Sequence, residues 1–203
     1  MNTLVDTPSL VHSLNSASTP DHERLENRIM AAVPFHDREH YARFLEVQHA
    51  FYRDIDALYF DANLEKVLPD LAARRRLALI KQDFADLGIA LPELTDEPRF
   101  GAEIDLPTAL GWLYVAEGSN LGAASLLKRG AALGLSEEFG ARHLAAAPEG
   151  RGLHWRTFTT ALDAVELSGA ETERVIEAAH AAFDRVHALA ETLMPVDPDA
   201  ASK

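Results

Sequence analysis

The 203-residue chain contains no cysteine. This absence excludes disulfide bonds, thiolate nucleophiles, iron–sulfur clusters and cysteine-bound zinc. Aromatic residues are also scarce, at 7% of the sequence. No apolar run approaches the roughly 20 residues that a membrane-spanning helix needs. Any metal or cofactor would therefore depend on carboxylates or on the nine histidines.

Basic residues are fewer than acidic ones: the chain has 19 Lys and Arg residues and 32 Asp and Glu residues, which gives a net charge of −13. An acidic surface repels nucleic-acid phosphate and anionic lipid, so we expect neither nucleic acid nor a membrane as a partner. The first residues show no basic segment followed by a long apolar stretch. We therefore expect no secretory signal and a cytoplasmic protein.

The hydrophobic pattern predicts an all-α protein with a single domain, because apolar residues recur at three- and four-residue steps and no alternating strand pattern is visible. Pro20 after Thr19 is typical of a helix start, so we expect a loose tail over residues 1–18, the domain over 19–194 and a second tail over 195–203. The expected helices cover residues 19–33, 37–58, 63–68 and 71–87, one from residue 105 onward, 150–162 and 171–193.

The helix that follows Asp105 contains the unusual stretch Gly118-Ser119-Asn120-Leu121-Gly122. Glycine inside a helix costs about 1 kcal/mol relative to alanine, so two of them mark a kink or a close approach of the backbone to something else. Gly118 and Gly122 are four residues apart and share a helix face. The spacing of the two glycines favours neither of two interpretations: a flat ligand lies on this face, or another helix packs closely against it.

A second pattern lies near the N-terminus, where His22 and Glu26 are neighbours on one helix face. A histidine that binds a metal usually passes its other ring N–H to a carboxylate or carbonyl, and Glu26 can fill that role. The alternative is a solvated His–Glu pair without a ligand, which is the commoner case for such a pair taken alone.

Three segments in this order resemble the heme oxygenases of Gram-negative bacteria, in the branch that serves iron acquisition. They are Thr19–Glu26, Gly118–Gly122 and Phe139–Leu144, and the similarity extends from Asn15 to Leu193. The resemblance implies a single-domain helical bundle in which heme b lies between the first helix and a glycine-kinked distal helix. Heme would be both cofactor and substrate, and O2 would open it to biliverdin, carbon monoxide and ferrous iron.

The resemblance assigns His22 as the axial ligand of the heme iron, oriented by Glu26. It places Gly118, Ser119 and Gly122 against the distal face of heme. Ser119 departs from the animal members of the family, which carry an aspartate there that organises water. Protons would then pass through water held by other groups, for which Gln48, His49, Arg75 and Arg76 are candidates.

Other residues matched to the family would hold the edges of the heme. Lys128 and Arg129 stand where bacterial relatives carry basic residues for the heme propionates. Tyr114 and Asn15 lie near the heme edge in relatives, and Phe183 on the last helix is a candidate for the heme wall. A solvated helix face for the two basic residues and an ordinary core position for Phe183 stay open as alternatives.

No glycine-rich dinucleotide motif is present, so the electrons would come from an external donor, a separate reductase or ferredoxin. The resemblance implies a monomer. The purpose is either release of iron from heme or supply of biliverdin to a bacteriophytochrome. A non-catalytic heme-binding protein would share His22 and the glycines.

A di-iron carboxylate site is the rival metal centre, because the chain contains the two Glu-x-x-His segments 46–49 and 177–180. Two such segments are close to chance for this composition, and a di-iron site does not explain the glycines. Heme-free relatives of the fold that degrade thiamine use a cysteine nucleophile, which this chain lacks.

Overall fold

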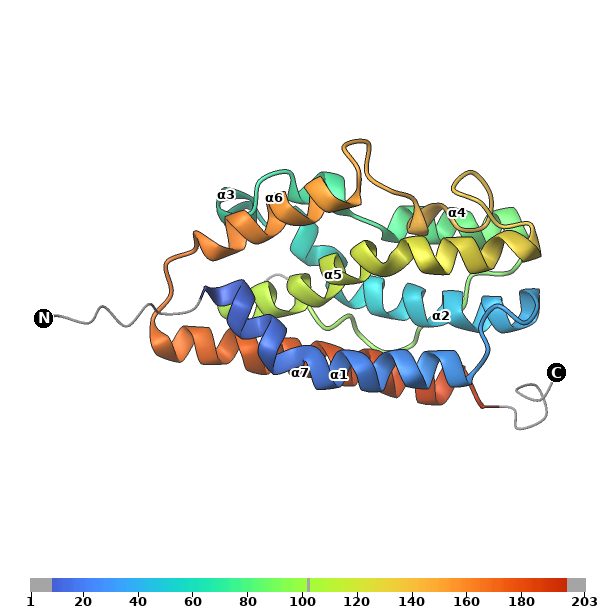
Figure 1. Cartoon of the computed structure of the whole chain (residues 1–203), viewed down its shortest axis with the longest axis horizontal. Helices are drawn as coiled ribbons and strands as arrows, with labels where there is room; N and C mark the ends of the chain where they lie inside the picture. The colour runs from blue at the N-terminus through green and yellow to red at the C-terminus, as the bar shows by residue number, and fades with distance from the viewer. Residues whose placement is uncertain (1–8, 102, 197–203) are drawn as a thin grey trace, which may run out of the picture.

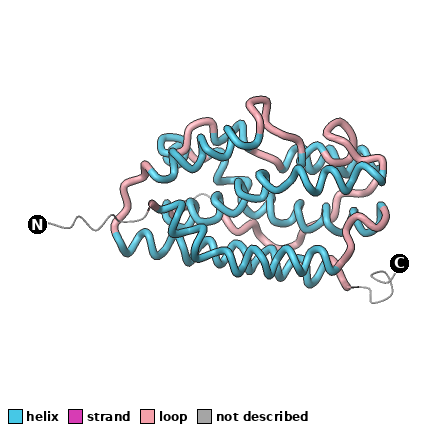
Figure 2. The backbone as a smooth tube through the Cα atoms, viewed as in Figure 1, coloured by secondary structure: helices cyan, strands magenta, loops and turns pink. Residues whose placement is uncertain are grey.

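The computed structural model describes residues 9–101 and 103–196. Seven α-helices occupy most of this part of the chain, and Figure 2 shows helices joined by loops, with no strand in the described ranges. The all-α prediction is therefore confirmed. None of the helices in the described ranges is long and apolar enough to cross a membrane.

The helix α7 (Gly169–Leu193) is the centre of the packing, and α5 (Leu106–Gly130), α1 (Leu10–Ala31) and α2 (Arg38–Ile55) all lie against it. Figure 1 shows α1 beside α7, with α5 running along the middle of the molecule. The short α3 (Ala62–Val67), α4 (Leu77–Leu87) and α6 (Arg151–Asp163) cover the other side of α2 and α5. Four 3-10 helices, over residues 56–60, 71–74, 131–133 and 142–144, lie in the connections between the α-helices.

Local sequence signals set most of the helix ends. Asp37 caps α2 by accepting a hydrogen bond from the His40 backbone N–H at 2.8 Å. Ser168 and Glu171 form a capping box at the start of α7. Gly88 ends α4 in the left-handed conformation, with φ of 67°. These boundaries agree with the sequence predictions.

The start of α1 corrects the sequence prediction, because the helix begins at Leu10 and passes through Pro20. Residues 10–18 of the expected tail are therefore helical, while residues 1–8 lie outside the described part. Proline inside a helix removes a hydrogen bond and costs about 3 kcal/mol. Burial of Leu14 and a hydrogen bond from the Val11 backbone to Asp163 on α6 at 2.8 Å stabilise this first part of the helix and offset part of that cost.

The helix expected over residues 71–87 is also corrected, since it divides into a 3-10 helix and α4. Between them, Arg75 takes an extended backbone with ψ of 134°. The break lets neighbouring arginines reach different partners. Arg74 binds Glu117 at 3.0 Å, while the Nε of Arg75 lies 2.6 Å from Asp56.

Candidate functional site

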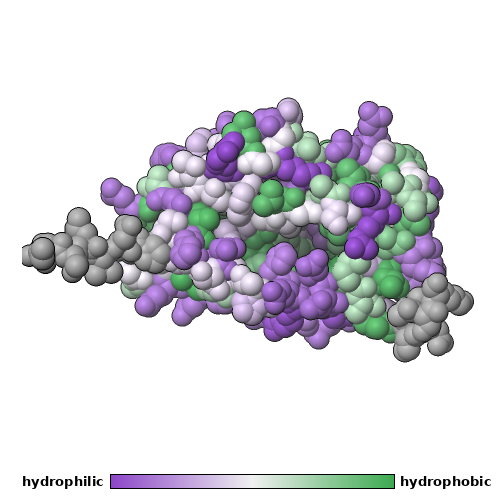
Figure 3. Space-filling view, viewed as in Figure 1, coloured by the Kyte–Doolittle hydropathy of each residue, from purple (hydrophilic) through white to green (hydrophobic). Residues whose placement is uncertain are grey.

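A hollow in the surface separates α1 from α5. Figure 3 shows it in the middle of the face drawn in Figure 1, with hydrophobic residues on its floor. The main packing of α1 is against α7 and α6 rather than against α5. The two helices that carry the histidine and glycine motifs therefore border a space instead of closing on one another.

His22 is an exposed residue of α1, and its ring meets the edge of Phe183 from α7. The ring centroids are 6.3 Å apart and the planes cross at 83°. Phe183 itself is buried, so its ring is a fixed surface against which the imidazole packs. The structure thus brings together two residues that the sequence analysis assigned to one site. The imidazole stays accessible to a ligand.

Two other site residues on α1 lie on the side of the helix that carries His22. Glu26 and Asn15 are both exposed, and they lie about one turn after and about two turns before His22. Asn15 lies within α1 rather than before it, which corrects its expected place. Within residues 9–101 and 103–196 no hydrogen bond joins Glu26 to His22, so the orienting role of Glu26 stays a prediction.

The glycines of α5 differ sharply in what surrounds them. A Cβ atom added to Gly122 would meet nothing within 4 Å, and one added to Gly118 would make ordinary contact with Trp155 at 3.7 Å. At Gly111, in contrast, a Cβ atom would overlap the Val175 carbonyl oxygen at 2.4 Å. Close helix packing therefore explains Gly111, and it does not explain Gly122.

Ser119 lies between these glycines and binds inward. Its hydroxyl donates to the Ala116 carbonyl at 2.7 Å and lies 3.2 Å from the hydroxyl of Tyr52 on α2. Tyr52 also donates to the Ala116 carbonyl at 3.3 Å. Such side-chain bonds to a helix carbonyl favour bending, yet α5 is assigned as unbroken helix through both glycines.

Tyr114 is one turn before Gly118 and links three helices. It is buried, and its ring is 5.7 Å from the ring of Trp155 on α6. Burial raises the pKa of Tyr114, and a hydrogen bond with Ser18 of α1 partly opposes that rise. Tyr114 therefore lies where α1 and α6 both approach α5.

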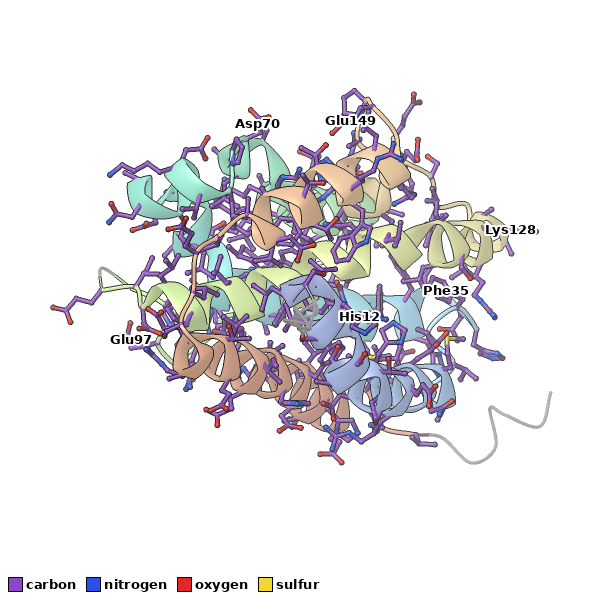
Figure 4. All side chains as sticks on the ribbon, turned by 60° about the vertical axis from the view of Figure 1, so that its left-hand side comes forward. His12, Phe35, Asp70, Glu97, Lys128 and Glu149 are labelled. Carbon is purple, nitrogen blue, oxygen red and sulfur yellow. The ribbon has the colours of Figure 1, made fainter. Side chains whose placement is uncertain are left out.

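The two basic residues expected for an anionic ligand lie in the last turn of α5. Lys128 and Arg129 are both exposed, and Figure 4 shows Lys128 at the end of that helix. Arg129 comes about two turns after Gly122, so it lies on the same helix face. Across the described ranges, no ion pair engages either residue.

Behind α5, on the side of α6, lies a buried polar cluster centred on Glu117. The Arg74 guanidinium binds Glu117 at 3.0 Å, and the Tyr59 hydroxyl donates to it at 3.3 Å. The Nε2 atom of His154 lies 3.5 Å from Glu117, and its Nδ1 atom lies 2.7 Å from Glu149. Contact with these two carboxylates raises the pKa of His154, with Glu117 the larger cause.

Glu117 is absent from the residues predicted for the site, and its position beside Gly118 within an apolar helix is the one signal in the sequence that points to it. The candidates for holding distal water are partly corrected. Burial lowers the pKa of His49 to about 4, and its ring packs against Phe84 in the core. Arg75 is engaged by Asp56. The role of Gln48 and Arg76 in holding distal water stays a prediction.

The structure does not assemble the rival di-iron site. The two Glu-x-x-His segments fall on α2 and α7, where His49 is buried in the core and His180 is bound to Asp21. Among the residues that the structure describes, no three His, Asp or Glu side chains converge as a metal site would require.

Comparison with known proteins gives consistent matches. A family model for heme oxygenase matches residues 8–192. Heme oxygenase PigA of Pseudomonas aeruginosa is 42% identical over 172 residues, which are 85% of this chain and 86% of that protein. A crystal structure of the NO- and CO-bound heme oxygenase of Neisseria meningitidis superposes with a TM-score of 0.87 at 36% identity, covering 95% of this chain and 96% of that one.

Proposed function

Because the chain belongs to the heme oxygenase family, we propose that it binds heme between α1 and α5 and opens it at this site. It is an enzyme of heme degradation, and its products are biliverdin, carbon monoxide and ferrous iron. The observation that carries the site is the open space above Gly122, next to a helix that presents the exposed His22. A flat ligand that is held through its metal needs a binding side chain on one side and a helix face without side chains on the other.

In this proposal the His22 imidazole would hold the heme iron, and Phe183 supports the ring of His22. The ring contact at 6.3 Å limits the directions in which His22 can point. The group bound there supplies iron that activates O2. The chain's own contribution is to fix the iron on one side through His22 and to exclude bulky side chains on the other through Gly118 and Gly122.

The distal side also needs a way to hold protons near bound O2. Ser119 and Tyr52 place two hydroxyls 3.2 Å apart at the glycine segment. Burial raises the pKa of Tyr52 to about 12, so this phenol keeps its proton at neutral pH. These hydroxyls are well placed to anchor water, in the position where animal relatives use an aspartate.

Lys128 and Arg129 are proposed to hold the heme propionates. Replacing both with glutamine should weaken hemin binding by roughly two- to thirtyfold, since exposed ion pairs contribute about 0.2–1 kcal/mol each. The loss should shrink as salt rises, because salt screens exposed charges. Titration of hemin at low and high ionic strength measures both effects. Lys66→Gln on α3 is the matched control, and an equal loss in that variant would contradict the assignment.

An external reductase or ferredoxin is the proposed electron source, and the enzyme is proposed to act as a monomer. We favour release of iron from heme as its purpose, because the similarity is to the iron-acquisition branch of the family. Supply of biliverdin to a bacteriophytochrome uses the same chemistry. A bacteriophytochrome gene next to that of this enzyme would favour the second purpose.

The experiment that tests this function is hemin titration followed by addition of a reductant in air. We expect a Soret band that forms on binding and is lost on turnover, with a blue-green bile pigment in its place. A non-catalytic heme-binding protein would form the band and keep it. Persistence of the band with reductant and O2 present would contradict the proposal.

A further inference from the structure

The carboxylate of Glu117 is placed directly before the glycine segment, and it is held by three separate elements. Tyr59 comes from the 3-10 helix over residues 56–60, Arg74 from the one over residues 71–74, and His154 from α6. Both carboxylate oxygens are used, since Tyr59 donates to Oε1 while Arg74 and His154 lie at Oε2. Glu117 is only 2% exposed, so these contacts define its surroundings.

Charge buried in this way is a poor source of stability. The cost of removing two charges from water offsets much of their attraction, and well-packed hydrophobic residues often serve as well or better. In some proteins a buried ion pair instead serves to select one packing arrangement over its neighbours. The glycine segment that follows Glu117 directly is a place where one arrangement has to be selected.

The segment Gly118–Gly122, called the distal segment from here on, is fixed only in part by its own side chains, because its two glycines have none and Ser119 reaches Tyr52 on α2 at 3.2 Å. Gly122 has nothing near its Cβ position, and Gly118 touches only Trp155. A helix normally keeps its place through interlocking side chains. Here the position along and around the α5 axis also depends on residues that flank the glycines, beside the Arg151 contact with the Asn120 carbonyl at 2.8 Å.

The α6 helix provides that position. Trp155 lies against Gly118, and its neighbour His154 lies at Glu117. Arg74 joins the same contact, because it also donates to the backbone carbonyl of His154 at 3.2 Å and stacks over the ring of Phe158 at 5.6 Å. One guanidinium therefore ties α5 and α6 together at the level of the distal segment.

We propose that Glu117 is a positioning residue that, through Arg74 and His154, sets the place of the distal segment relative to bound heme. This inference rests on the proposed function, since it concerns the distance between the α5 backbone and the heme face. Glu117 itself does not touch the ligand. It acts through the helix, so a change there alters the surroundings of a small molecule bound to the heme iron.

The test uses Glu117→Gln, which keeps the size of the side chain and removes its charge. The readout is the C–O stretching band of the ferrous heme complex with carbon monoxide, which reports the distal surroundings without turnover. We expect the band to shift or to split relative to the wild type, and the isomer composition of biliverdin to change.

The matched control is Asp54→Asn, which removes another buried carboxylate held by two arginines, Arg53 and Arg185. It should lower the thermal midpoint and leave the C–O band unchanged. Glu117→Gln with a wild-type band and wild-type isomer composition, despite a similar loss of stability, would overturn the proposal. Failure of the proposed function would give a different result from failure of this inference, because the wild type would then not degrade heme at all.

Glu117→Gln leaves Arg74 as a buried charge and can impair folding. The double variant Glu117→Gln with Arg74→Gln removes both charges and keeps hydrogen-bonding groups in place. We expect it to fold and still to show the altered C–O band, because two neutral amides hold the helix less firmly than the ion pair. A wild-type band in the folded double variant would also overturn the proposal.

Discussion

His22→Ala should abolish the spectrum of a histidine-ligated heme and lower the rate of heme cleavage by at least about a hundredfold. Loss of a partner that merely orients a ligand costs about 10–100-fold in affinity or activity, and loss of the ligand itself costs more. The exposed ring contributes little to the core, so helix content and thermal midpoint should stay near those of the wild type. Absorption of the ferric and ferrous complexes measures the change.

Added imidazole provides a rescue for this variant, because it can occupy the space left beside Phe183 and bind the iron. Return of the spectrum with imidazole would separate loss of ligation from loss of fold. His12→Ala is the matched control, since His12 is another exposed histidine of α1. If His12→Ala lost the spectrum and His22→Ala kept it, the assignment of the ligand would be wrong.

Gly122→Leu should prevent heme cleavage while making the free protein slightly more stable. Leucine favours helix over glycine by roughly 0.5–1 kcal/mol, and nothing lies within 4 Å of the Cβ position to oppose it. The side chain would instead fill the space proposed for heme. A displacement of about 1 Å from the productive geometry can cost about a hundredfold in rate. Thermal unfolding and the rate of biliverdin formation test the two halves of the prediction.

Gly111→Ala is the control for this variant, because it changes a glycine of the same helix that packs against α7. The added methyl group would overlap the Val175 carbonyl oxygen, which at 2.4 Å forces the backbones apart. Overpacking of this kind costs about 1–3 kcal/mol. We expect a lower thermal midpoint with cleavage largely retained. Wild-type turnover in Gly122→Leu would show that open space above this glycine has no role in heme binding.

The contrast between Gly111 and Gly122 shows which features of the site the sequence alone could not predict. The helix periodicity, the helix start at Asp37 and the helix end before Gly88 are local, so the sequence predicted them, and the start of α7 lies two residues before the predicted one. Whether a helical glycine faces a partner or a void depends on where other helices lie. The sequence left those alternatives equal for Gly122, and it did not single out Gly111 at all.

The same limit explains the other differences. Thr19 and Pro20 formed a good local signal for a helix start, and tertiary contacts of residues 10–18 overrode it. The role of Glu117 was invisible because its three partners are far away in the sequence. His22 and Phe183, in contrast, were assigned to one site by the family resemblance, and the structure places their rings 6.3 Å apart.

The central claim is that this chain opens heme rather than only binding it. The most direct measurement is identification of the pigment, by absorption and mass, after turnover of the hemin complex with a reductant in air, together with detection of carbon monoxide. The account predicts biliverdin and carbon monoxide in equal amounts, with ferrous iron released. Recovery of intact heme, or its bleaching to fragments without carbon monoxide, would contradict it.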